Sequence, residues 1–383
     1  MKIGILYPSS KAHPGMMADF ADGIKTVLKH HQLNNEIELV SEIVGFGGNE
    51  KDVYEKAEKV LILEEADILV AYIDQRVISL LEPLLHASGK LMIVVNPGAN
   101  YPENWIPQPN IIYLTLQHSF LCWLSGVQAA KNNTGGAAVS TGFFDCGYLH
   151  VAAVTNGFIN NGGNILHNHV NKSLYNETFE IKALTDFLAA NKETVNLLCV
   201  LDTSPAALFY DRLNKYEESK RLHLYVSPMM LEQSAWKANG EGFNFLIEGH
   251  LPYNAAAGNE ANVEFRKIFM EQTKRDASLF ALQGWETAMV LKQIFDKYKD
   301  NYTDGAYVAD HLATTIINSP RGELKLDKET HFFTAPVYKG IIKNNTQKLL
   351  ITAAENAEDE WKNFVTNPVT GPSSGWTNTY LCY

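Results

Sequence analysis

The chain has 383 residues, a formal net charge of −11, and 46% hydrophobic and 20% charged residues. This length and composition indicate a globular protein of two lobes and exclude a disordered or low-complexity chain. The acidic balance, with no run of Lys and Arg, argues against a nucleic-acid partner.

The first third of the chain alternates strand-like apolar runs with amphipathic segments. Apolar side chains at Met16, Phe20, Ile24 and Val27 recur every three or four positions, which predicts a helix with one buried face. The continuous apolar run 91–95 is typical of a strand covered on both faces. The expected strands are 2–7, 36–44, 66–73, 91–95 and 111–116, and the expected helical segments are 16–27, 53–61 and 75–87.

A second series repeats this alternation, so we expect an α/β protein with two parallel sheets. The expected strands are 137–144, 164–170, 197–201, 222–226 and 243–251, and the helices are 119–130, 148–160, 179–190 and 205–216. Helices at 262–274, 279–298 and 306–317 and strands at 323–326, 337–343 and 349–352 follow. Asn-Pro, Gly-Pro and Ser-Ser pairs predict an irregular tail at 355–383, which either docks on the second lobe or offers a partner surface.

The four cysteines lie far apart in the chain and form no C-x-x-C pair, so we expect free thiols rather than a zinc or redox site. They are Cys122, Cys146, Cys199 and Cys382. No apolar run is long enough to span a membrane, and 1–7 is too short for a signal peptide. These patterns predict a cytoplasmic protein, or a periplasmic one if a leader was removed.

No motif indicates catalysis, a metal or a cofactor. Gly371–Gly375 has the G-x-S-x-G spacing of a hydrolase but not the strand and helix that such a serine needs. His167 and His169 lack a third ligand at metal spacing, and Gly45-x-Gly47-Gly48 lacks the spacing of a dinucleotide loop. We therefore expect a protein that is not an enzyme.

Six phrases spread over residues 2–352 resemble the type I periplasmic binding protein family, in its branch of branched-chain amino acid and amide receptors. They are Ile3–Pro8, Ala66–Tyr72, Val94–Asn100, Gly142–Gly147, Ala281–Ala288, and Ser319–Asp327 with Thr334–Tyr338. The resemblance implies two Rossmann-like lobes, joined by three hinge crossovers near Gln117, 250–252 and 331–334. Lobe 1 would comprise 1–117 and 252–331, and lobe 2 would comprise 118–251 and 332–354.

In such a fold a ligand binds between the lobes, at the loops that follow the strands, and closure of the hinge buries it. The residues that we expect there are Ser9, Ser10, Met16, Tyr72, Asp74, Gln75, Asn96, Pro97 and Gly98 in lobe 1, and Phe144, Asp145, Cys146, Asp202, Thr203, Ser227 and Pro228 in lobe 2. The resemblance adds Trp285 as an aromatic ring against the ligand. Each aspartate has an alternative role as a helix N-cap, and Trp285 and Cys146 have one in packing.

The sequence departs from the amino-acid receptors of this family at two places. Their Gly-Pro-x-Ser-Ser loop, which holds the ligand carboxylate, is replaced by Ala71–Gln75, and the position near Pro228 is not acidic. Asp74, Asp145 and Asp202 favour a cationic or donor-rich ligand, because an unpaired buried carboxylate is costly. We expect a solute receptor for an amino acid, amide or amine that works with an ABC permease; the alternative is a cytoplasmic or partner-coupled ligand sensor.

Overall fold

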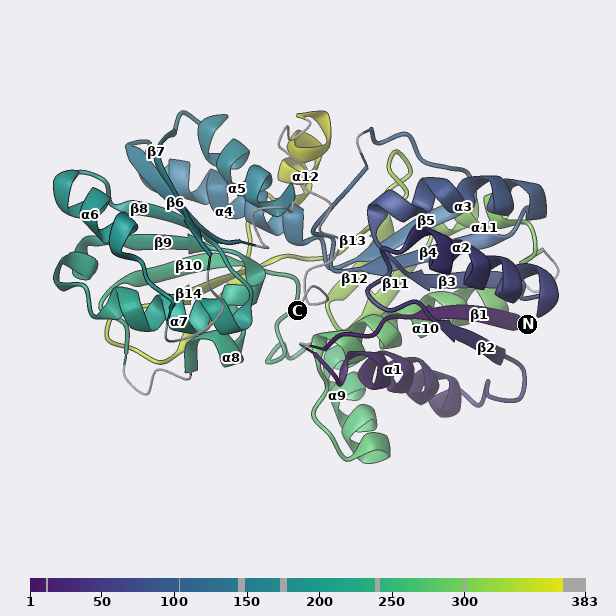
Figure 1. The fold of residues 1–383 in the computed structure, drawn as a ribbon. Helices are drawn as coiled ribbons and strands as arrows, with labels where there is room; N and C mark the ends of the chain where they lie inside the picture. The colour runs from purple at the N-terminus through teal and green to yellow at the C-terminus, as the bar shows by residue number, and fades with distance from the viewer. Residues whose placement is uncertain are drawn as a thin grey trace.

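The computed structural model describes residues 1–11, 13–102, 104–143, 149–172, 178–237, 242–298 and 301–367. Within these ranges the chain forms two α/β lobes side by side, each built around its own sheet (Figure 1). We call them lobe 1, which contains the first strand, and lobe 2. This arrangement confirms the predicted α/β class with two largely parallel sheets.

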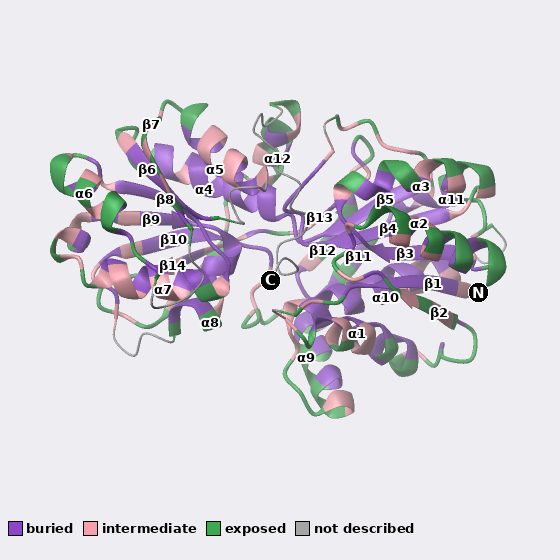
Figure 2. Cartoon of the chain, in the orientation of Figure 1, coloured by how far each residue is buried: buried purple, intermediate pink, exposed green. Residues whose placement is uncertain are grey.

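The sheet of lobe 1 has five parallel strands. They are β1 (Lys2–Tyr7), β2 (Glu38–Ile43), β3 (Ile68–Tyr72), β4 (Leu91–Asn96) and β5 (Ile111–Thr115), in the order β2-β1-β3-β4-β5. The helices of this lobe are α1 (Met16–His30), α2 (Glu50–Glu58), η1 (Lys59–Leu63), α3 (Gln75–Ser88), α9 (Glu260–Thr273), α10 (Leu279–Lys297) and α11 (Gly305–Leu312). Every residue of β3, β4 and β5 is buried (Figure 2), as expected for strands covered on both faces.

Helices α1 and α10 pack closely against each other over this sheet. The predicted stripe of α1 is buried, and Phe20, Ile24 and Val27 have no exposed surface. Gly284 of α10 permits the close approach, because a Cβ atom there would lie 2.0 Å from the backbone oxygen of Phe20. The C-terminal helices of the chain therefore return to complete the core of lobe 1.

The sheet of lobe 2 has seven strands, of which the last two in sequence are antiparallel to their neighbours. They are β6 (Gly136–Gly142), β7 (Asn164–Asn171), β8 (Asn196–Val200), β9 (His223–Val226), β10 (Leu246–Leu251), β14 (Tyr338–Ile342) and β15 (Leu349–Ala353), in the order β15-β14-β10-β9-β8-β6-β7. The helices are α4 (His118–Asn132), α5 (Leu149–Ile159), α6 (Lys182–Ala190), α7 (Thr203–Asn214), η3 (Glu217–Arg221), η4 (Pro228–Leu231) and α8 (Gln233–Trp236).

A third, small antiparallel sheet lies beside lobe 1. It contains β11 (Ile316–Ser319), β12 (Gly322–Leu326) and β13 (Phe333–Thr334). The helix predicted at 306–317 is wrong in its last turn, because α11 ends at Leu312 and Ile316 begins a strand. The β-branched residues 314–317 favour a strand, and the residues of β11 alternate between exposed and buried.

The chain crosses between the lobes three times. The first crossover is at 116–117, between β5 of lobe 1 and α4, which packs on the sheet of lobe 2. The second lies in 252–259, between β10 and α9, and the third lies in 335–337, between β13 and β14. Gln117 has a φ of +55°, so the first crossover is a sharp turn in the left-handed region.

The prediction of an irregular chain after Glu355 is wrong for its first part. Residues Ala357–Thr366 form a helix, α12, whose Trp361 and Phe364 are buried. Acidic side chains fill the first turn of α12, where they interact favourably with the helix dipole. The Pro- and Ser-rich segment on which the prediction rested lies beyond residue 367, outside the described residues.

Candidate ligand-binding site

The carboxyl ends of β1, β3 and β4 in lobe 1 point toward those of β6, β8 and β9 in lobe 2 (Figure 1). We call the loops that follow these strands the interlobe site. Three observations bring the two sides of this site together. The Leu149 N–H of α5 donates to Oδ1 of Asn100 in lobe 1 at 3.3 Å. His13 in lobe 1 interacts electrostatically with Asp202 in lobe 2. Met229 of η4 in lobe 2 is fully buried in the hydrophobic core of lobe 1.

The loop after β1 carries Ser9, Ser10 and His13. Ser9 is exposed, and its N–H donates to the carbonyl of Gly45 at 2.7 Å. The Ser10 hydroxyl accepts a hydrogen bond from the His13 N–H at 3.1 Å, and the His13 ring lies edge-on to Phe280 at 5.8 Å. Burial lowers the pKa of His13, and the nearby Asp202 carboxylate opposes this shift. His13 is therefore a polar group of the interlobe site that the sequence analysis missed.

Asp74, after β3, caps helix α3. Its Oδ1 accepts from the N–H and the Nε of Arg76, both at 3.1 Å, and its Oδ2 accepts from Nδ2 of Asn100 at 3.1 Å. Burial raises the pKa of this carboxyl group, and the hydrogen bonds from Asn100 and Arg76 oppose that shift. Both oxygens are thus held by groups of the protein, in agreement with the capping alternative. The neighbouring Gln75 hydrogen-bonds the Tyr113 side chain.

Asn96, the last residue of β4, and Pro97 and Gly98, which follow it, are all buried. Nδ2 of Asn96 donates to the Ile73 carbonyl at 2.9 Å, and its Oδ1 accepts from the Gly98 N–H at 2.8 Å. Gly98 has a φ of +75°, and a Cβ atom there would lie 2.8 Å from the backbone of Gln117. This loop therefore supports the first crossover.

Three other predicted site residues lie in the hydrophobic core of lobe 1. Met16 and Tyr72 are fully buried, and Tyr72 donates to Oε1 of Gln283 at 3.1 Å. The Trp285 ring packs on Phe265 at 5.1 Å and is 3% exposed. Gln283 in turn donates its Nε2 hydrogen to the Asn96 carbonyl at 3.0 Å, and the Met16 N–H donates to the His13 carbonyl at 2.9 Å. Tyr72 and Met16 are thus linked to the loops of the interlobe site.

In lobe 2, Asp202 and Thr203 follow β8, and Ser227 and Pro228 follow β9. Asp202 is 3% exposed, and its Oδ1 accepts from the Thr203 N–H at 2.5 Å, so it caps α7. Burial raises the pKa of Asp202, and the hydrogen bond from Thr203 and the charge of His13 oppose this shift. The Ser227 hydroxyl is buried with no hydrogen-bond partner among the described residues, and Pro228 opens η4.

Phe144, Asp145 and Cys146, which we also predicted for lobe 2, lie outside the described residues. Among the described residues that follow in the chain, His150 near the start of α5 interacts with His118 at the start of α4. Both rings are buried, and burial lowers the pKa of each to about 3. These two histidines are neutral at pH 7.

The described part of the chain has no group of three His, Cys, Asp or Glu side chains able to hold a metal ion. His167 lies on β7, where its ring stacks on Phe187 at 4.5 Å. Cys122 and Cys199 are free and buried, and burial raises the pKa of both thiols. No described helix is long and apolar enough to cross a membrane.

Two lobes with parallel sheets, three crossovers, and polar loops that meet between the lobes are the architecture of a hinged binding protein. Residues 1–347 match the sequence profile of a periplasmic binding protein family. The chain therefore belongs to the periplasmic binding protein family, which confirms the resemblance seen in the sequence. This is a family of binding proteins and not of enzymes. No curated protein sequence matches the chain.

Solved structures share the fold over nearly the whole chain. An ABC transporter substrate-binding protein from Sphaerobacter thermophilus has a TM-score of 0.75 and 13% identity, covering 93% of this chain and 97% of its own. A leucine-binding protein from Thermotoga maritima has a TM-score of 0.67 and 15% identity, with coverages of 94% and 99%. A solute-binding protein from R. palustris in complex with benzoate has a TM-score of 0.68 and 18% identity, with coverages of 93% and 98%. These likenesses confirm the type I periplasmic binding protein fold.

Proposed function

We propose that the protein is the solute receptor of an ABC transporter and that it binds a small polar ligand between its lobes. The observation that carries this proposal is the electrostatic interaction between His13 and Asp202, which come from opposite lobes. A ligand that contacts both side chains gains interactions only when the lobes are closed, so it shifts the population toward the closed form. A permease that recognises the closed form would then receive loaded protein, in the periplasm.

We further propose that the ligand carries an amine or an amide donor, as an amino acid does. Asp202 is an acceptor in a buried setting that raises its pKa, so a cationic or N–H donor ligand would stabilise its carboxylate. Ser9, Ser10 and Ser227 add hydroxyl groups for a second polar group of the ligand. The similar structures include a protein named for leucine binding and one in complex with benzoate, so the fold accommodates both amino acids and aromatic acids. Asp202 favours the amino acid over an aromatic acid, because a benzoate has no donor for it.

A thermal-shift screen of ligand-stripped protein tests both proposals. The panel is leucine, glutamine, acetamide, putrescine and benzoate. A ligand at one hundred times its Kd stabilises the folded protein by about 2.7 kcal/mol, which such a screen detects. Stabilisation by an amine or amide supports the full proposal, and stabilisation by benzoate alone supports a receptor but contradicts the ligand class.

The variant Asp202→Asn sharpens the assignment. We expect this variant to weaken the binding of an amine ligand, with a Kd that rises roughly tenfold or more, because a hydrogen bond to a charged group contributes about 1.5–3 kcal/mol. The matched control is Asp186→Asn on α6 of the same lobe, whose side chain is 63% exposed and pairs only with Lys182 in the described structure. Equal affinities of the two variants, measured by calorimetry, would remove Asp202 from the site.

A further inference from the structure

Helix α12 contacts both lobes beside the crossovers. On the side of lobe 1, Nε1 of Trp361 donates to Oδ2 of Asp327 at 2.8 Å, in the turn between β12 and β13. Trp105, in the connection between β4 and β5, lies edge-on to Trp361 at 5.6 Å and to Phe364 at 5.8 Å. Tyr101 from the same connection lies 5.1 Å from Phe364. These contacts tie α12 to lobe 1.

On the side of lobe 2, α12 packs on α4. The Phe120 ring lies 5.3 Å from that of Trp361, and the Trp123 ring lies 5.8 Å from that of Phe364. Glu360 accepts a hydrogen bond from Nε1 of Trp123 at 3.5 Å and pairs with Lys131 at 3.5 Å. The same two aromatic side chains of α12 therefore touch both lobes, and they are only 7% and 2% exposed.

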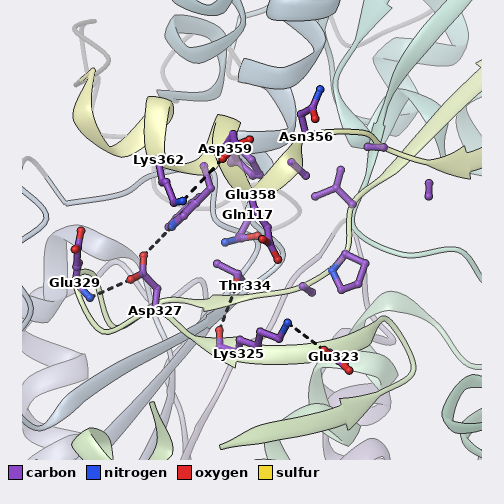
Figure 3. A pocket seen from close by; sticks show the side chains of 18 of the residues that line it. Gln117, Glu323, Lys325, Asp327, Glu329, Thr334, Asn356, Glu358, Asp359 and Lys362 are labelled. Atoms are coloured by element: carbon purple, nitrogen blue, oxygen red, sulfur yellow. Dashed lines mark hydrogen bonds and ion pairs between the residues drawn. The ribbon is translucent and has the colours of Figure 1, made fainter. Parts of the chain in front are cut away.

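A pocket of about 900 Å³ separates α12 from β12 next to these contacts (Figure 3). Its walls include Gln117 of the first crossover and the segment 334–337, which contains the third. Figure 3 shows Asp327 and Lys325 on the β12 side, Asp359 and Lys362 on the α12 side, and Gln117 between them. Beside this open space, Trp361 and Phe364 belong to one hydrophobic cluster with Tyr101 and Phe332 of lobe 1 and Phe120 of α4, so α12 joins the two lobes through their side chains.

We propose that α12 is a brace that sets the angle between the lobes. Rotation about the crossovers moves Phe120 and Trp123 relative to Trp105 and Asp327, and one rigid helix cannot follow both sides. Opening or twisting the lobes must therefore break one set of contacts of Trp361 and Phe364. Losing two such aromatic pairs should change the ratio of the two lobe arrangements by roughly 5-fold to 150-fold.

The brace proposal is tested on the ligand-free full chain by measuring the distance between the lobes. Spin labels are attached at Lys51→Cys on α2 and Lys182→Cys on α6, and electron spin resonance gives the distribution of distances between them. Both positions are exposed, and a Cys146→Ser, Cys382→Ser background restricts labelling to them. We expect Trp361→Phe, which loses the bond to Asp327, and Trp105→Leu, which alters only the lobe 1 side, to broaden or shift the distance distribution. Trp361→Ala with Phe364→Ala should shift it further.

Trp236→Phe is the matched control. Trp236 is also 7% exposed and donates its Nε1 hydrogen to a protein oxygen, Leu231 O at 2.9 Å, but it lies within lobe 2. We expect this variant to keep the wild-type distances. Near-ultraviolet circular dichroism shows whether Trp105→Leu and Trp361→Phe are folded. If both variants are folded and their label distances equal those of the wild type, the brace proposal is wrong. Trp105→Leu alone decides the question if the α12 variants fail to fold. The readout needs no ligand, so it stands apart from the outcome of the ligand screen.

Discussion

Lobe 1 and lobe 2 differ in the partners of their buried charged and titratable side chains. In lobe 1, Nη2 of Arg321 donates to Glu286 at 2.7 Å and its Nε donates to the same carboxylate at 2.9 Å, with both side chains buried. Asp74 is likewise held by Arg76 and Asn100. In lobe 2, burial is the largest influence on the pKa values of Asp202 and of His118, His150 and His250. The clearest difference is that lobe 1 buries a paired arginine and glutamate, whereas lobe 2 buries three histidines whose charged forms are penalised by burial.

The largest expected effect of this difference is acid sensitivity. Burial lowers the pKa of His118, His150 and His250 to about 3, whereas an unfolded histidine titrates near 6.5. The unfolded chain therefore binds more protons below pH 6.5, and stability present above that pH is lost as the pH falls toward 3. At pH 5 each histidine removes about 2 kcal/mol, so we expect a loss of several kcal/mol from pH 7 to pH 5.

Urea unfolding at the two pH values measures this loss. His250→Gln should reduce the difference between pH 7 and pH 5 by about 2 kcal/mol, because one of the three groups no longer titrates. The raised pKa of Asp202 has the opposite effect on stability, because protonation of this carboxylate favours the folded state. As the pH falls, Asp202 therefore offsets part of the stability that the histidines remove. Equal stability of the wild type at pH 7 and pH 5 contradicts the assignment of neutral buried histidines.

The next largest effect is expected for the ion pair of lobe 1. Arg321→Met leaves Glu286 buried without its partner, which typically costs about 3–5 kcal/mol. Arg321→Met combined with Glu286→Gln should recover part of this loss, because no lone charge then stays buried. Lys325→Met, on the exposed side of β12, is the control and should change the free energy of unfolding by less than about 0.5 kcal/mol. A wild-type urea midpoint for Arg321→Met would show that the pair does not stabilise lobe 1.

The smallest effect separates the two capping aspartates. Asp74→Ala removes a cap and also the acceptor for Arg76 and Asn100, so we expect a loss of about 2–3 kcal/mol. Asp202→Ala removes a cap, but it also removes a carboxylate that burial disfavours. The free energy of unfolding should therefore fall by about 1 kcal/mol or less. Chemical denaturation of both variants at pH 7 measures the difference. The reverse order would mean that Asp202 is the structural residue and Asp74 is not.

The elements of the two main sheets were predictable because their signals are local. The strands predicted at 66–73, 91–95, 111–116 and 197–201 correspond to the fully buried strands β3, β4, β5 and β8, and the stripe of α1 became a buried helix face. The strand at 316–319 was missed because a short apolar segment after a helix fits either period. Helix α12 was missed because Asn-Pro and Gly-Pro pairs beyond it dominated the composition of the last thirty residues.

The candidate site was only partly predictable. The strand-end rule located Asp74, Asp202 and the serine loops, since the position of a loop follows from the order of strands. The same rule selected Tyr72 and Met16, whose side chains lie in the hydrophobic core of lobe 1, as does that of Trp285, which the family resemblance suggested. The rule did not find His13 or Met229, because their contacts join segments about two hundred residues apart.

By itself the sequence determined the α/β class, the order of most strands and helices, and the family, because periodicity and local phrases are properties of neighbouring residues. The tertiary structure decided which carboxylates are held by protein groups, which histidines are neutral, and that α12 contacts both lobes. These properties depend on burial and on distances between groups far apart in the chain. Only the folded chain brings such groups together and removes water from around them.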